Sequence, residues 1–312
     1  MKKGLLILPA LVCLAITALA APPRASHVFI VSFDQGAPSG ILKGDMPVFK
    51  EMAAEGAHTW NAYTVVPSST LPSHASMLTG VGVQKHQVLW NDYDSQKGFV
   101  KVPTIFRIAK EHGLVTAMFV AKPKFETLAL PGSLDVFVKP EPPDAKSVAG
   151  AFADQVGKLK PNLCFIHFGD PDVAGHQYGM NSAEKMQAFA ECDAALHVIK
   201  TAIDSAGLTD SSVVILTADH GGHDVTAAEP GQQAKPGGKV LRGTHGSAIT
   251  EDVEIPWVAW GKGVKKNFEI TAPVVIYDTS ATALWLLGIE IPEGFWGRPV
   301  TTAFQSEKPA KD

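Results

Sequence analysis

Residues 212–220 read SVVILTADH, a run of mainly apolar and β-branched residues that ends in an aspartate and a histidine. Its composition and length predict a strand over Ser212–Ala218. Asp219 and His220 then stand directly at the carboxyl end of that strand. Ligands bind at this end of the strands in open α/β sheets, so the stretch indicates a fold class and a place for a site.

Further predicted strands and helices alternate on both sides of this stretch. The strands are His27–Phe33, Val115–Val120, Asn162–Phe168 and Pro256–Trp260. One helix is capped by Asp45 and runs to about Glu55, and the others are Pro103–His112, Asp144–Lys160, Ser182–Ser205 and Asp278–Leu287. This alternation predicts an α/β fold with a largely parallel central sheet and helices on both faces. No repeat or linker divides the pattern, so we expect residues 21–312 to form a single domain.

The first twenty residues have the three-part pattern of a secretory signal peptide. Two lysines supply the positive start, an apolar run follows from Leu5 to Leu19, and small residues occupy the cleavage positions up to Ala20. A membrane anchor is the alternative, but the run is shorter than the ~20 apolar residues that span a bilayer. We therefore expect an exported chain, periplasmic or secreted, whose mature part has no membrane span.

The charge of the chain argues against a nucleic-acid duplex as its main partner. The formal net charge is −4 at pH 7, and loss of the two lysines of the signal peptide takes it to −6. An acidic protein does not attract a phosphate backbone. The mature chain keeps Cys164 and Cys192. Export permits a disulfide between them, but their places in a predicted strand and a predicted helix favour two buried free thiols.

Three predicted strands deliver carboxylates to the same edge of the sheet. Asp34 follows the first strand directly, Asp170 and Asp172 follow the strand at 162–168, and Asp219 follows the strand at 212–218. Clustered carboxylates without a cation repel one another and resist ionisation. A divalent metal ion supplies the missing positive charge, so this edge is a candidate metal site.

Imidazole groups complete the candidate ligand set. The set comprises Asp34, Asp172, His176, Asp219, His220 and His245. Mixed imidazole and carboxylate ligands suit zinc, and six groups with one hydroxyl are enough for two ions. Taken singly, an aspartate after a strand can be a turn or cap residue, and Asp172 with His176 can be a helix-surface pair. We interpret His27, His58, His112 and His197 as surface or packing residues, and His167 and His223 as possible supports for neighbouring ligands.

Thr70 is the candidate hydroxyl. It precedes a predicted helix at about Ser73–Leu78, and backbone N–H groups at a helix N-terminus favour an anion. A hydroxyl beside a metal ion can lose its proton and attack phosphorus. The alternative is that Thr70 only caps the helix, a role for which the neighbouring serines compete.

The chain resembles the alkaline phosphatase superfamily, and within it the type I phosphodiesterase/nucleotide pyrophosphatase branch. The matching motifs run in family order over nearly the whole mature chain: Ser32-Phe33-Asp34, Thr70-Leu71-Pro72-Ser73-His74, Leu78-Thr79-Gly80, His86 with Asn91, Pro171-Asp172 to Gly175-His176, Thr217-Ala218-Asp219-His220-Gly221, Gly243-Thr244-His245-Gly246, Leu287-Gly288-Ile289 and Gly297-Arg298-Pro299. The resemblance implies an alkaline-phosphatase-like catalytic domain.

The resemblance also implies residue roles and a cofactor. Two zinc ions would be bound, one by Asp34, Thr70, Asp219 and His220, the other by Asp172, His176 and His245. Thr70 would be the nucleophile that forms a covalent phospho-enzyme, and Asn91 would hydrogen-bond a phosphoryl oxygen. The implied substrate is a small phosphate ester or a nucleotide. Two adjacent metal ions can stabilise the attacking and leaving oxygens of an in-line displacement.

The sequence around Lys122 does not decide between a phosphate diester and a phosphate monoester as the preferred substrate. Some bacterial monoesterases of the superfamily carry Lys-x-Arg at a similar place, where this chain has Lys122-Pro123-Lys124; a solvated basic turn is the alternative. A phosphomonoesterase is therefore the second interpretation, after a phosphodiesterase or nucleotide pyrophosphatase. A sulfatase is disfavoured because Thr70 stands where those enzymes need cysteine or serine. A periplasmic binding protein would not need the ligand set.

Overall fold

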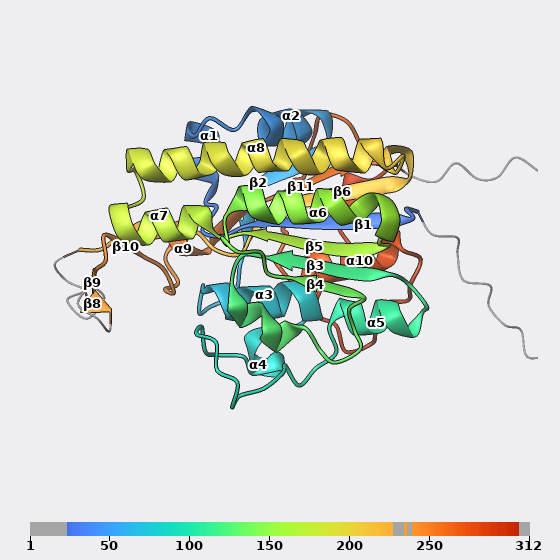
Figure 1. Ribbon diagram of the computed structural model, residues 1–312, viewed down its shortest axis with the longest axis horizontal. Coiled ribbons are helices and arrows are strands. Elements are labelled where there is room, and N and C mark those ends of the chain that lie inside the picture. The colour runs from blue at the N-terminus through green and yellow to red at the C-terminus, as the bar shows by residue number, and fades with distance from the viewer. Residues whose placement is uncertain (1–23, 227–233, 236–238, 306–312) are drawn as a thin grey trace, which may run out of the picture.

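The computed structural model describes residues 24–226, 234–235 and 239–305. An eight-stranded sheet in the order β12-β2-β11-β6-β1-β5-β3-β4 crosses the molecule, with helices on both faces (Figure 1). Its strands are β1 (His27–Phe33), β2 (Ala57–Tyr63), β3 (Thr116–Val120), β4 (Val136–Val138), β5 (Leu163–Phe168), β6 (Ser212–Ala218), β11 (Glu254–Gly261) and β12 (Phe268–Glu269). Only β11 runs antiparallel to its neighbours, so the predicted α/β class is confirmed.

The remaining elements surround this sheet. The helices are α1 (Pro38–Lys43), α2 (Pro47–Glu55), α3 (Thr70–Thr79), α4 (Val83–His86), α5 (Ile105–Glu111), α6 (Ala145–Leu159), α7 (Asp170–Tyr178), α8 (Ala183–Ser205), α9 (Thr250–Val253) and α10 (Asp278–Leu286). Short 3₁₀ turns are η1 (Pro123–Leu128), η2 (Thr209–Ser211) and η4 (Thr301–Ala303). Two small strand pairs join β7 (His223–Asp224) to β10 (Gly243–Thr244) and β8 (Ala234–Lys235) to β9 (Lys239–Val240).

The sheet separates two hydrophobic cores. Val28 and Ile30 of β1 face a core shared with α3, α5 and α10, whereas Phe29, Val31 and Phe33 face a core shared with α2, α6 and α8. Burial on both faces explains why β1, β5 and β6 are nearly continuous apolar runs. Cys164 and Cys192 both lie in the second core and are free, and burial raises the pKa of both thiols.

Most predicted helix ends agree with the structure because local caps define them. Asp144 accepts a hydrogen bond from Ser147 N, and Ser182 accepts one from Lys185 N. The predicted cap at Asp45 is wrong: α2 begins at Pro47, and Asp193 of α8 accepts from Val48 N and Phe49 N at 3.0 and 2.8 Å. A distant side chain therefore takes the role that the sequence pattern assigned to a local one.

Two other expectations concern the signal peptide and a membrane span. The predicted signal peptide, residues 1–20, lies outside the described residues. Within residues 24–226, 234–235 and 239–305, no helix combines the length and the apolar character that crossing a membrane requires.

Candidate metal centre

The register of the sheet brings three chain segments together at one edge. Phe33 of β1 pairs with Phe168 of β5 on one side and with Ala218 of β6 on the other. The next residues, Asp34 and Asp219, therefore leave the sheet side by side, as the predicted strand ends require. Asp170 also lies here, but its Oδ1 accepts from Ala145 N at the start of α6.

Asp34, Asp219 and His220 form the first candidate metal group. All three are fully buried, and their ligand atoms lie within 4.8 Å of one another. His220 Nδ1 hydrogen-bonds to Gly221 O at 2.8 Å. Its Nε2 therefore points to the carboxylates, 3.5 Å from Asp34 Oδ1 and 3.3 Å from Asp219 Oδ2.

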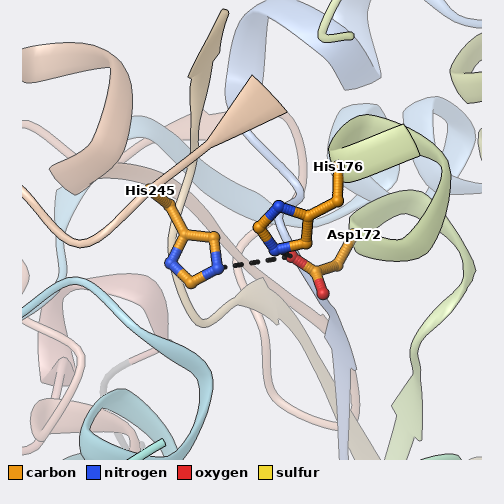
Figure 2. A group of neighbouring side chains, drawn as sticks. All are labelled: Asp172, His176 and His245. Carbon is orange, nitrogen blue, oxygen red and sulfur yellow. Dashed lines mark ion pairs between the residues drawn. The ribbon is translucent and has the colours of Figure 1, made fainter. Parts of the chain in front are cut away.

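Asp172, His176 and His245 form the second candidate group (Figure 2). Asp172 and His176 are one turn apart on α7, which places both side chains on one face, and His245 reaches them from the segment after β10. His176 Nε2 lies 3.2 Å and His245 Nε2 3.5 Å from Asp172 Oδ1. Their Nδ1 atoms bond to Gly243 O at 2.8 Å and Ser68 O at 2.9 Å. Carbonyl partners of this kind orient metal-binding imidazoles.

The donor atoms of both groups fit metal ions. One carboxylate oxygen of each aspartate is buried and has no hydrogen-bond partner among the described residues: Asp34 Oδ1, Asp172 Oδ1 and Asp219 Oδ2. A buried anionic oxygen without a partner is costly. A cation held between these oxygens and the Nε2 atoms would satisfy them.

Burial and charge also favour a bound cation. Burial, and then the neighbouring charge of Asp34, raise the pKa of Asp219 well above its ordinary value. The buried carboxyl therefore resists ionisation until a positive charge compensates it. Burial lowers the pKa of His220 and of His245 and so favours the neutral form of both rings. A neutral imidazole is the form that binds metal.

The two groups are adjacent, and Thr70 lies against the first. The rings of His220 and His245 stack with centroids 3.8 Å apart. Thr70 Oγ1 is 3.4 Å from His220 Nε2. Thr70 is the first residue of α3, earlier than predicted, and the N-cap is Ser69, whose side chain makes no capping hydrogen bond. The cap position therefore belongs to Ser69, and the hydroxyl of Thr70 lies beside the metal group.

Asn91 lies next to the amino end of α3. Its Oδ1 accepts hydrogen bonds from Leu71 N at 2.9 Å and from Lys124 Nζ at 3.2 Å. These two donors determine the orientation of the amide, so its Nδ2 carries the donors that remain for another ligand.

Lys122 lies between the two groups. Its Nζ is 2.6 Å from Asp34 Oδ2 and 2.6 Å from Asp172 Oδ2, and its side chain is 15% exposed. Although burial opposes its charge, Asp172 and Asp34 raise the pKa of Lys122 above its ordinary value. The lysine is therefore an internal cation of the site and does not have the contacts of a solvated turn.

Several supporting contacts join residues that are far apart in sequence. His167 Nε2 bonds to Asp34 Oδ2 at 2.9 Å, which agrees with the supporting role considered for it. His223 Nδ1 bonds to Asp252 Oδ1 at 2.7 Å. Ser68, which orients His245 across 177 positions, carried no signal in the sequence. Among the described residues, neither metal group includes any of the histidines interpreted as surface or packing residues.

Comparisons with known proteins identify the same family. The family model for type I phosphodiesterase/nucleotide pyrophosphatase matches residues 28–236. Ectonucleotide pyrophosphatase/phosphodiesterase family member 7 of Mus musculus is 25% identical over 70% of this chain and 55% of its own length. The bis(5'-adenosyl)-triphosphatase enpp4 of Xenopus laevis is 25% identical over 69% and 52%. Steryl-sulfatase of Mus musculus is 27% identical over 51% and 27%. The chain spans about half the length of the first two.

Solved structures agree on the fold. An inactive variant of murine ectonucleotide pyrophosphatase/phosphodiesterase 5 in complex with AMP has a TM-score of 0.76 at 17% identity, covering 90% of this chain and 100% of that chain. The human protein 5 has a TM-score of 0.75 at 18% identity, with the same coverage. This likeness shows an alkaline-phosphatase-like fold. Because the family model matches more than half of its length, the chain belongs to the type I phosphodiesterase/nucleotide pyrophosphatase family.

Proposed function

We propose that the chain hydrolyses phosphate esters, as a phosphodiesterase or nucleotide pyrophosphatase, at a two-zinc site with Thr70 as the nucleophile. The observation that carries this proposal is the adjacency of two three-ligand groups with the Thr70 hydroxyl beside one of them. Zinc ions bound there would supply positive charge for the phosphoryl oxygens and lower the pKa of the hydroxyl.

The proposed reaction consists of two successive displacements at phosphorus. The Thr70 hydroxyl releases its proton to solvent, its oxygen forms a bond to phosphorus, the bond from phosphorus to the leaving oxygen breaks, and that oxygen leaves as an alcohol or phosphate that takes up a proton from water. Water next attacks the phospho-threonine, which releases the phosphate product and restores the hydroxyl. The first turn of α3 holds Thr70 in place, since Thr70 O accepts from His74 Nδ1 at 2.7 Å.

Asn91 and Lys122 would contact the phosphoryl group. The amide of Asn91 is oriented by Leu71 N and Lys124 Nζ, which leaves its Nδ2–H groups to donate to a non-bridging oxygen. The Lys122 ammonium lies between Asp34 and Asp172 and would add positive charge next to the same oxygens.

A phosphomonoesterase is the second candidate, and the position of Lys122 favours it. A monoester brings a dianion, whereas a diester brings one negative charge, so a nearby ammonium attracts the monoester more strongly. A sulfatase remains disfavoured despite the partial likeness to a steryl-sulfatase, because the nucleophile position holds Thr70. We further propose that residues 1–20 direct export to the periplasm or the medium, and that residues 21–312 form one catalytic domain.

The test is a parallel assay of bis-p-nitrophenyl phosphate and p-nitrophenyl phosphate with the protein purified from the exported fraction. We expect close to two zinc ions per chain by elemental analysis, hydrolysis of both compounds with a preference for the diester, and loss of both activities after exhaustive chelation. Zinc should restore them. Full activity after complete metal removal would contradict the proposed site, and a preference for the monoester would favour the second candidate.

A further inference from the structure

Lys185 is a buried cation that the proposed reaction does not use. It lies on the first turn of α8 and is 2% exposed. None of the ion pairs found among residues 24–226, 234–235 and 239–305 includes it. Its Nζ instead donates to Gln35 Oε1 at 2.6 Å and lies 3.3 Å from Gln35 O and from Met180 Sδ. A buried ammonium is costly, so these contacts need an explanation.

Gln35 connects this lysine to the first metal group. It follows Asp34 directly, and its backbone N–H donates to Asp219 Oδ1 at 3.1 Å. Asp219 Oδ1 also accepts from His220 N at 2.9 Å, and together the two bonds leave Asp219 Oδ2, the oxygen without a partner, turned toward His220 Nε2. Gln35 has a φ of 59°, a left-handed conformation that is unfavourable for a residue other than glycine. Tertiary contacts must therefore hold it, and its side-chain oxygen is held by Lys185.

The side chain of Gln35 also fills the space between two ligand-bearing segments. A Cβ atom added at Gly175, the residue before His176, would collide with Gln35 Oε1 and lie 2.9 Å from Lys185 Nζ. A Cβ added at Gly222 would lie 2.7 Å from Gln35 Nε2. Gln35 thus packs against the backbone of α7 on one side and the segment after His220 on the other.

We propose that Lys185 and Gln35 form a positioning pair that holds Asp219 and the segment carrying His176 in the geometry needed for metal binding. Lys185 acts through Gln35: its ammonium holds the amide, and the amide keeps the strained backbone at residue 35 and its hydrogen bond to Asp219. The inference rests on the proposed metal site. It assigns a role in that site to two residues outside the ligand set.

The direction in which zinc affinity changes distinguishes a positioning role of Lys185 from a purely electrostatic one. An ammonium near a metal ion repels it, so removal of the Lys185 charge alone would strengthen zinc binding. Loss of a residue that orients a ligand weakens binding, typically by 10–100-fold. Lys185→Met keeps the length of the side chain and removes the charge and its hydrogen bonds, and it therefore tests both ideas at once.

The experiment measures zinc affinity in the full chain by competition with a chromophoric chelator. The variants are Lys185→Met, Gln35→Gly and their double variant. Gln35→Gly removes the amide and suits the left-handed backbone, so it remains informative if Lys185→Met does not fold. Lys200→Met is the control, because Lys200 lies on the same helix and its partner is the surface residue Glu51, 3.6 Å away. Circular dichroism of the zinc-free proteins checks folding.

We expect Lys185→Met and Gln35→Gly each to weaken zinc binding by about tenfold or more. The double variant should bind zinc no more weakly than the weaker-binding single variant, because both substitutions act on one contact. The zinc affinity of Lys200→Met should equal that of the unaltered protein. Equal or tighter zinc binding by a folded Lys185→Met, or additive losses in the double variant, would overturn the positioning pair. If the unaltered protein bound no zinc, the proposed metal site itself would fail, which is a separate result.

Discussion

The ammonium nitrogen of Lys122 lies 2.6 Å from the Oδ2 atom of Asp172. It lies equally close to Asp34 Oδ2, so a single cation contacts one aspartate from each candidate metal group. If both proposed metal ions contact the phosphoryl group of the substrate, the Lys122 ammonium would lie close to that group. Its charge is therefore expected to affect substrate preference more than the fold.

Replacement of Lys122 by alanine should reduce monoesterase activity more than diesterase activity. The dianion loses a larger favourable interaction than the monoanion. We expect kcat/KM for p-nitrophenyl phosphate to fall roughly tenfold further than kcat/KM for bis-p-nitrophenyl phosphate, a difference of about 1.4 kcal/mol. Lys43→Ala is the control, because Lys43 is exposed and bonds to Asn181. Equal losses on the two compounds would exclude the proposed charge effect.

Replacement of Thr70 by alanine removes the proposed nucleophile, and kcat should fall by about a thousandfold or more. Thr70→Ser keeps the hydroxyl and should retain part of the activity. Zinc should still bind to Thr70→Ala, because Asp34, Asp219 and His220 remain, so elemental analysis separates loss of chemistry from loss of metal.

The stereochemical course at phosphorus decides between Thr70 and water as the nucleophile. Two successive in-line displacements retain the configuration of a chiral phosphorothioate substrate, whereas a single attack by water inverts it. We expect retention. Inversion, or nearly normal turnover by Thr70→Ala, would mean that Thr70 does not form a covalent intermediate.

Loss of any one residue of the second metal group should impair the same bound ion. Single replacements of Asp172, His176 and His245 by alanine should each cause a large loss of kcat/KM. The triple variant should be little worse than the worst single variant, because residues that act as a unit are not additive. Independent contributions that add in the triple variant would show that the three side chains do not share one ion.

His86 should make the zinc-free protein less stable as the pH falls. Its Nδ1 accepts from Val88 N at 3.0 Å, so Nε2 carries the proton that bonds to Ser76 Oγ at 2.9 Å. Burial lowers the pKa of His86 from 6.5 to about 4. Between these values the unfolded chain binds a proton that the folded chain does not, so the stabilisation present above pH 6.5 is lost as the pH falls toward 4.

Urea denaturation at several pH values measures this effect. The difference in unfolding free energy between the unaltered protein and His86→Asn should shrink from pH 7 to pH 4.5. Val156→Ala removes a buried apolar group of the other hydrophobic core that does not titrate, and its difference from the unaltered protein should stay constant. A difference for His86→Asn that is independent of pH would show that the fold does not hold His86 neutral.

The parts of the fold that were predictable from sequence are those with a local physical signal. The strands at 27–33 and 212–218 have the expected bounds because burial on both faces requires a continuous apolar run. The strand β2 was missed, since its sequence AHTWNAY mixes polar and apolar residues without that run. The start of α2 was misplaced because its capping carboxylate, Asp193, lies 145 positions from Val48.

In the candidate site too, residues with a local sequence signal were predictable and residues placed by long-range contacts were not. The candidate ligand aspartates directly follow strands or begin the next helix, so the predicted strand ends alone were enough to group them. Gln35 and Lys185 had no such signal, since their contact spans 150 positions and depends on the backbone conformation of residue 35. Local patterns identify groups that chemistry requires, whereas tertiary packing alone selects the residues that hold them.

The central place of β1 has a consequence for how the chain acquires its structure. Its two neighbouring strands, β5 and β6, come much later in the chain. The hydrogen bond from His167 of β5 to Asp34, the residue after β1, spans 133 positions. During synthesis β1 leaves the ribosome long before either neighbour exists, and contacts of such long range form slowly. An apolar strand with both edges unpaired is prone to aggregate. The newly made chain should therefore depend on chaperones until β5 and β6 have paired with β1.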